Sequence, residues 1–190
     1  MSLDVQQRLA GEVERAIPKG RGGWRERDPE YRALRKLAAR NRRHPPRTPT
    51  DALQHVADVA REMTDGTYCA LAVTGTDDYV EGFIVSGMSD DELKALKGPP
   101  QGHGPLGTMR QDGLPVHIAD LREHQKAFGF PPKHPGMQEL LGVPIFAGPE
   151  VRGALYVTDR RRGGRFTEAD QQVLRVLARH AGLIIDASWY

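Results

Sequence analysis

Two apolar segments joined by a short Gly-Pro-Glu turn constrain the fold of this 190-residue chain more than any other feature. Leu140–Phe146 and Val151–Thr158 are rich in β-branched and aromatic residues, which predicts a β-hairpin. A long helix is expected to follow, because Thr167 and Asp170 have the spacing of a capping box. Apolar residues then recur at helical spacing as far as Ile185. A hairpin followed by such a helix indicates a sheet with one face covered by helices.

A second hairpin and another long helix are predicted upstream. Thr50 is expected to cap a helix whose apolar face runs from Leu53 to Met63. Alternating apolar residues then predict two paired strands, Tyr68–Thr74 and Tyr79–Ser86. The chain therefore offers two hairpins, each with a helix long enough to cover it.

Short elements are expected between the hairpins. Ser89 opens a short helix, Pro105–Gln111 is predicted to form another, and Val116–Ile118 has the pattern of a brief strand. This order predicts an α+β fold with a central antiparallel sheet of about five or six strands and the long terminal helices on one face. The Gly- and Pro-rich loops between Gly98 and Pro135, with their short helices, would roof a pocket on the other face.

The predicted organisation has a basic helical extension over residues 1–48 and a main domain over residues 49–190. Between Lys19 and Arg47 the chain carries eleven basic residues against three acidic ones. Pro29–Arg42 is predicted to be helical, with Asp28 as its N-cap, but its narrow apolar stripe predicts only weak docking. The charge would attract an acidic partner. A nucleic-acid partner is not expected, since no recognition helix or known DNA-binding motif accompanies the basic residues.

Composition and cysteine usage limit the location and the chemistry. No run approaches the roughly 18–20 apolar residues of a membrane span, so no membrane association is expected. The first residues lack the layout of a secretory signal, which makes a cytoplasmic location the expectation. Cys69 is the single cysteine, which excludes an internal disulfide and a cysteine-only metal cluster. Its place in an apolar strand predicts a small buried hydrophobic residue.

The sequence contains no recognisable catalytic or metal-binding motif. The chain has no nucleophile-elbow motif, phosphate-binding loop or paired-carboxylate arrangement, so we expect that it is not an enzyme. The histidines between residues 103 and 134 do not have the spacing of a zinc site. His103, which lies between two glycines, is open to two interpretations: a contact to a ligand phosphate or carboxylate, or a residue of a tight turn.

From about Thr50 to Tyr190 the chain resembles a GAF domain. The segments that carry the resemblance are the loop QGHGPLG, the hairpin LGVPIFAGPEVRGALYVTDR, and the terminal helix with its lead-in, GGRFTEADQQVLRVLARHAGLIIDAS. GAF domains are small sensory modules that bind cyclic nucleotides, tetrapyrroles or other small effectors, and many dimerise through bundles of their terminal helices. The resemblance implies a ligand-binding module that signals through its terminal helices, with a homodimer or a signalling protein as partner.

One branch of the family is especially similar. GFPPKHPGM, followed by LGVPI and GALYVT, resembles the haem-binding GAF domain of the mycobacterial sensor kinases DevS and DosT. The resemblance implies haem b as cofactor, His134 as the iron ligand, and Tyr156 as the residue that faces a bound gas. It also implies a pocket lined by apolar side chains. The expected lining residues are Phe128, Phe130, Met109, Met137, Leu141 and Ile145.

The chain departs from that branch at two points. Gly136 replaces a proline of the motif, and Gln138-Glu139-Leu140 replaces Arg-Ser-Phe, which would put a carboxylate near the haem edge. His134 therefore remains open to a second interpretation, as a loop residue that closes the pocket, and Tyr156 to a place in the core. The alternative function is a ligand-free dimerisation or protein-interaction module that uses the basic N-terminal arm.

Overall fold

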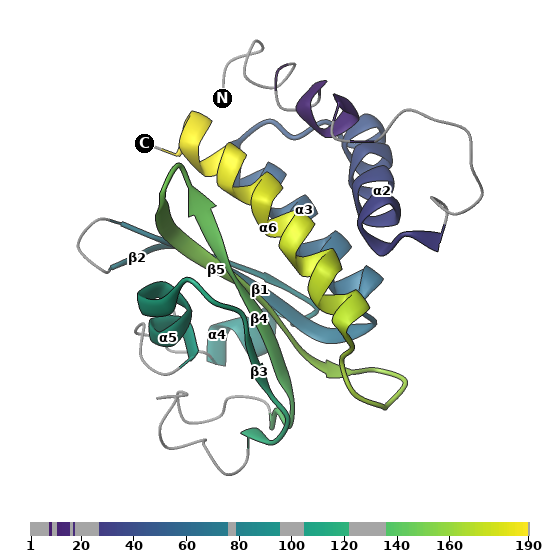
Figure 1. Ribbon diagram of the computed structural model, residues 1–190, viewed down its shortest axis with the longest axis vertical. Helices are drawn as coiled ribbons and strands as arrows, with labels where there is room; N and C mark the ends of the chain where they lie inside the picture. The colour runs from purple at the N-terminus through teal and green to yellow at the C-terminus, as the bar shows by residue number, and fades with distance from the viewer. Residues whose placement is uncertain are drawn as a thin grey trace.

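The computed structural model describes residues 27–75, 79–95, 105–121 and 136–189, together with residues 8, 11–15 and 17. Within these residues the strands form one open antiparallel sheet in the order β2-β1-β5-β4-β3 (Figure 1). The predicted α+β fold is confirmed. The strands are β1 (Gly66–Thr74), β2 (Val80–Ser86), β3 (Val116–Ile118), β4 (Leu140–Ala147) and β5 (Glu150–Arg160).

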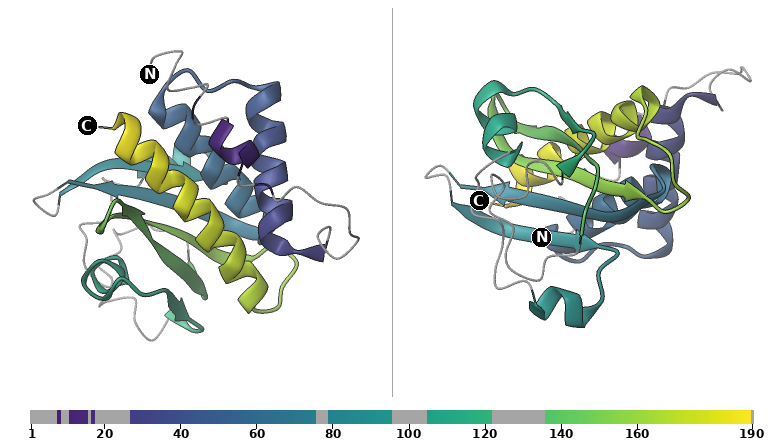
Figure 2. Two further views of the ribbon diagram at one scale, coloured as in Figure 1. Left: turned by 45° about the horizontal axis from the view of Figure 1, so that its top comes forward. Right: turned by 90° about the horizontal axis from the view of Figure 1, so that it is seen from below.

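One face of the sheet is covered by two long antiparallel helices, α3 (Pro49–Met63) and α6 (Glu168–Ser188), which run side by side across it (Figures 1 and 2). Each presents a continuous apolar stripe to the strands, as the sequence pattern predicts. Burial of each large aliphatic side chain in this layer contributes roughly 1.5–3 kcal/mol to stability. The largest fully buried members are Leu53, Leu71, Leu141, Ile145, Leu155, Leu174, Leu177, Ile184 and Ile185.

The cap of α3 differs from the sequence prediction. Thr48, rather than Thr50, is the N-cap, and its hydroxyl accepts a hydrogen bond from the backbone of Asp51 while the Asp51 carboxylate accepts one from Thr48. Pro49 takes the first helical position, where its missing N–H is not needed. The capping box therefore outcompetes the later threonine. The predicted capping box of α6, Thr167 with Asp170, is confirmed.

The N-terminal helix α2 (Pro29–Arg43) is part of the same core, so the prediction of weak docking is wrong. Ala33, Leu34, Leu37 and Ala38 are all buried, and the helix packs against both α3 and α6 (Figure 1). Small residues in its stripe let the helices approach closely, which a count of large apolar residues does not capture.

Polar contacts hold α2 to α3 along the same seam. Arg40 forms ion pairs with Asp58 and Glu62, and the ammonium of Lys36 lies 2.8 Å from the Glu62 carboxylate. These pairs neutralise part of the basic arm within the molecule. They also place α2 in a defined register on the domain.

The helix layer closes tightly on β4. A Cβ at Gly182 of α6 would collide with the backbone carbonyl oxygen of Phe146, so only glycine permits this approach. At the end of α6, the Trp189 ring covers Gly82 of β2 and its indole N–H donates to Glu81 at 3.3 Å. The terminal helix and its C-cap thus extend from β4 to the edge strand β2.

The opposite face of the sheet carries the short helices α4 (Asp90–Ala95) and α5 (Pro105–Asp112), which Figure 2 shows on the side away from α3 and α6. A second, smaller apolar cluster lies here. Its buried members are Ala70, Met109, Leu121, Met137, Leu140, Ala154 and Tyr156. This surface, called the ligand face below, is the side on which the sequence places a pocket.

Candidate functional site

Small residues form the centre of the ligand face. Tyr156 of β5 is paired with Ala70 of β1 on one side and Gly142 of β4 on the other. One step along, Ala154 is flanked by Ala72 and Pro144. Because these side chains are short, a group that packs on this floor can approach the strands closely.

Met109 of α5 packs directly on this floor. A Cβ at Gly142 would lie 2.9 Å from the Met109 sulfur and 3.3 Å from Cβ of Tyr156, so the missing side chain makes room for the thioether. Met109 is fully buried and Tyr156 nearly so. Methionine is an adaptable packing partner for an aromatic ring and for flat apolar ligands.

Two hydroxyl groups supply the polar character of the face. Burial raises the pKa of Tyr156, so its phenol stays protonated and serves as a neutral hydrogen-bonding group. Thr158 lies two residues further along β5, on the same side of the strand, and is 1% exposed. Its hydroxyl has no hydrogen-bond partner among the described residues. A buried hydroxyl without a partner costs about 1–3 kcal/mol.

The rim of the face is polar. The Tyr68 hydroxyl donates to the Glu92 carboxylate at 3.1 Å, which ties β1 to α4. The backbone N–H and the hydroxyl of Ser89 also donate to this carboxylate, and these hydrogen bonds, with that from Tyr68, hold the pKa of Glu92 below its ordinary value. Partial burial and the Glu92 contact raise the pKa of Tyr68. The rim therefore carries a fixed negative charge beside a neutral floor.

Three of the predicted site residues meet on this face. Met109, Met137 and Tyr156 belong to one buried cluster. Leu141 and Ile145 do not, because they lie among the helices on the other side of the sheet. Successive residues of a strand point to opposite faces, and the even-numbered residues of β4 face the ligand side. The expectation that Leu141 and Ile145 line the pocket is corrected accordingly.

His134, Phe128 and Phe130, with His103, lie outside the described residues, so their predicted roles stay predictions. Glu139, expected beside a haem edge, has partners of its own within the protein. Its buried carboxylate accepts from the backbone N–H of Phe166 at 3.1 Å and lies 2.7 Å from His117 Nε2. It joins the edge of the sheet to the lead-in of α6, which is a structural role.

Cys69 is buried on the helix side of β1, as expected for a small hydrophobic residue. Burial raises the pKa of its thiol well above the ordinary value, so the reactive thiolate is disfavoured. The thiol therefore presents no nucleophile to the ligand face.

The described residues contain neither a candidate metal site nor a candidate membrane-spanning helix. No group of three or more His, Cys, Asp or Glu side chains in these ranges is arranged to hold a metal ion. No helix in the same ranges combines the length and the apolar character needed to cross a bilayer.

Thr158 is the residue of this face that sequence reasoning missed. Its signal was present, since a threonine two residues after Tyr156 in an apolar strand must share its face. The hydroxyl was overlooked because threonine is common in strands for its shape alone.

A comparison with protein families matches residues 46–186 to the GAF domain model. The chain belongs to the GAF family. The predicted domain start at residue 49 lies close to the start of this match, although α2 shares the core of the GAF domain. The matched residues include the whole sheet, α3, and α6 except for its last two residues.

Solved structures resemble the protein in fold at low sequence identity. The GAF domain of an Acinetobacter phosphoenolpyruvate-protein phosphotransferase is 16% identical, with a TM-score of 0.60 over 98% of this chain and 96% of that one. The free methionine-R-sulfoxide reductase of Neisseria meningitidis is 20% identical, with a TM-score of 0.61 over 83% and 90%. A far-red absorbing protein with bound biliverdin IXa is 15% identical, with a TM-score of 0.58 over 83% and 99%.

Proposed function

We propose that this GAF domain is a regulatory module that binds a small, flat, largely apolar ligand on the ligand face. The observation that carries the proposal is the buried Thr158 hydroxyl, which has no partner among the described residues. It lies two residues along β5 from Tyr156, between Tyr68 of β1 and Leu140 of β4. A ligand with one hydrogen-bonding group would satisfy the hydroxyl and cover the apolar floor at once.

Haem is the specific ligand that we propose from the resemblance to the DevS and DosT domains. The described part of the face has the chemistry that a flat apolar group requires, since it combines small side chains with Met109, Met137 and one phenol. In this version His134 ligates the iron and Tyr156 faces the gas site. The bound group would supply reversible binding of a diatomic gas. The biliverdin-bound neighbour supports a tetrapyrrole only as an analogy of fold.

We also propose that the module has no catalytic activity of its own. One neighbour reduces free methionine sulfoxide according to its name, and the known form of that chemistry passes through a cysteine disulfide. Here the single cysteine lies on the helix side of the sheet, away from the ligand face. Binding, rather than turnover, is the role that the geometry supports.

A signal would pass through the central strand. Tyr156 and Thr158 face the ligand side. Leu155 and Val157, which alternate with them along β5, pack into the helix core. A ligand that shifts β5 therefore moves the surface on which the helices rest. We propose that occupancy biases the position of α6, and through it a partner subunit or a signalling protein.

The first experiment tests haem directly. Absorption spectra would be recorded for the purified protein as isolated and after addition of haemin, for the wild type and for His134→Ala. A sharp Soret band at roughly 400–430 nm that the variant loses supports His-ligated haem. A broad free-haemin spectrum that is identical in both proteins rejects the haem version and leaves the wider proposal to the next experiment.

The second experiment tests the ligand face without assuming the ligand. Thr158→Val keeps the shape but removes the unpartnered hydroxyl, so ligand-free protein should gain about 1 kcal/mol of stability. Native mass spectrometry of protein taken from cells would show whether a co-purifying small molecule is retained. We expect the wild type and Thr158→Ser to retain it and Thr158→Val to lose it. Equal retention by all three proteins, or none by the wild type, would reject the proposed site.

A further inference from the structure

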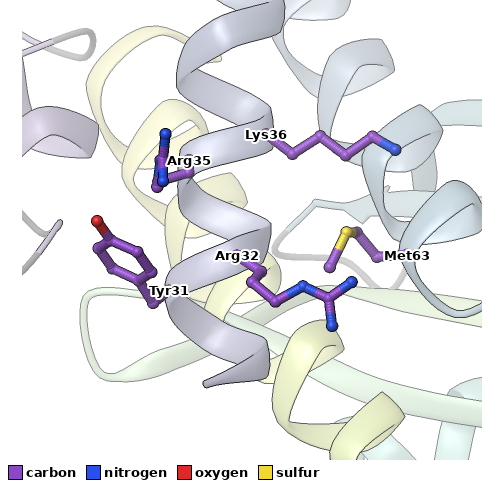
Figure 3. Close-up of a pocket in the computed structure, with 5 residues that line it drawn as sticks. All are labelled: Tyr31, Arg32, Arg35, Lys36 and Met63. Carbon is purple, nitrogen blue, oxygen red and sulfur yellow. The ribbon is translucent and has the colours of Figure 1, made fainter. Parts of the chain in front are cut away.

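A hollow of about 560 Å³ lies on the other side of the molecule, on α2 and the last turn of α3. Figure 3 shows Tyr31 and Arg35 along one side of α2, and Arg32 and Lys36 along the other, next to Met63. It is open to solvent, and its size lies within the range of small-molecule sites. Since α2 lies on the helix side, this hollow is independent of the ligand face.

The hollow has an excess of positive charge that the protein does not neutralise. Arg32 and Arg35 are exposed, and neither has a carboxylate partner among the described residues. Lys36 is paired with Glu62, but Arg40 shares the same carboxylate. Burial alone would raise the pKa of Glu62, but the hydrogen bond and charge of Lys36, together with Arg40, outweigh it and lower that pKa. Glu62 is thus ionised and already shared, and two guanidinium groups remain available.

The arrangement of the cations favours a ligand with several negative charges. Arg32 lies one turn before Arg35 and Lys36, which project to its two sides, so the three head groups can contact different parts of one extended anion but do not converge on a single carboxylate. Guanidinium groups match phosphate oxygens through paired hydrogen bonds.

From these observations we infer a second binding site, for a small molecule that carries two or more linked phosphates. Arg32 and Arg35 hold the phosphates, and Lys36 assists from its pair with Glu62. Tyr31 and Met63 provide an apolar margin against which the rest of the ligand packs. Arg35 lies 5.7 Å from the centre of the Tyr31 ring, which keeps its guanidinium aligned with that margin.

The test is a calorimetric titration of the whole protein with inorganic tripolyphosphate and, separately, with orthophosphate. We expect saturable binding of tripolyphosphate at least about tenfold tighter than of orthophosphate, weakening as salt is added. Replacing both guanidiniums, in Arg32→Ala/Arg35→Ala, should weaken it by about tenfold or more. Both side chains are exposed on a helix, where alanine is well tolerated, so the variant is expected to fold.

A matched control comes from the same helix. Arg43→Ala removes one positive charge three turns away from Arg32, and it should change the affinity less than about twofold. Glu62→Gln removes the carboxylate that competes for Lys36, and it should tighten binding, whereas Asp91→Asn, an equal charge change on an exposed residue of α4, should not. Equal affinity for both anions, or equal losses in Arg43→Ala and in the double variant, would mean general ionic attraction and would overturn the inference.

Discussion

At Gly182 the absence of a side chain allows α6 to approach the sheet closely. Gly182→Ala would place a methyl group against the carbonyl oxygen of Phe146. Helix propensity alone predicts a gain of about 1 kcal/mol from this change. The collision predicts the opposite sign, a loss of about 2–3 kcal/mol. Urea unfolding measures the difference, and Gly136→Ala, where nothing lies within 4 Å, should stay within about 0.5 kcal/mol of the wild type.

His180 makes the stability depend on pH. Burial in the helix core lowers its pKa to about 4 from an ordinary value of 6.5. Between these two values the unfolded chain binds a proton that the folded protein does not, so stability is lost as the pH falls. We expect the free energy of unfolding to drop by about 2 kcal/mol between pH 7 and pH 5 through this residue.

Urea titrations at pH 7 and pH 5 check this, with His180→Gln as the comparison. The variant has no imidazole to protonate, so its loss between the two pH values should be smaller by about the same 2 kcal/mol. An identical loss in both proteins would show that other groups control the acid sensitivity. His55, whose pKa is also lowered by burial and by Arg40, accounts for part of what remains.

At the scale of the element, α2 is expected to unfold with the domain and not before it. Leu37 is fully buried in the shared core, so Leu37→Ala should lower the global free energy of unfolding by about 2–5 kcal/mol. Chemical denaturation followed by circular dichroism measures the loss. Leu114→Ala, at a leucine that is 62% exposed, is the control and should cost well under 1 kcal/mol.

A different amide-exchange result would contradict this prediction. If Leu37→Ala speeds amide exchange only within α2 and leaves α6 protected as in the wild type, α2 is an independent appendage. The original prediction of weak docking would then be restored.

The elements with strong periodicity were predictable and the faces of the strands were not. The terminal helix, its capping box, β3, α5 and both hairpins follow from spacing and turn residues alone. The side of the sheet that Leu141 faces does not follow from spacing and turn residues. Counting pairs back from the turn, where Ala147 faces Glu150, puts Leu141 opposite Tyr156. A bulge between Ile145 and Phe146 shifts the register by one residue, and Gly142 takes that place instead.

For the molecule as a whole, the homodimer implied by the resemblance stays a prediction. α2 covers part of the surface of α3 and α6, so a second copy would have to use what remains. Leu183 of α6 is 41% exposed, which makes it the residue that we expect at such a contact. Light scattering should give twice the 21.1 kDa of the chain, and Leu183→Glu should return the single mass. A wild type of single mass would contradict the prediction.

The sheet also divides the strand residues into two sets that face opposite sides. In β1, β4 and β5 the odd-numbered positions, such as Leu71, Val143 and Leu155, hold the helices, and the even-numbered ones face the ligand side. Substitutions at one set therefore leave the direct packing contacts of the other set in place. A library confined to positions 70, 72, 154, 156 and 158 would explore new ligands on an unchanged scaffold. Within a family that shares one fold, binding preferences can drift in this way while stability is kept.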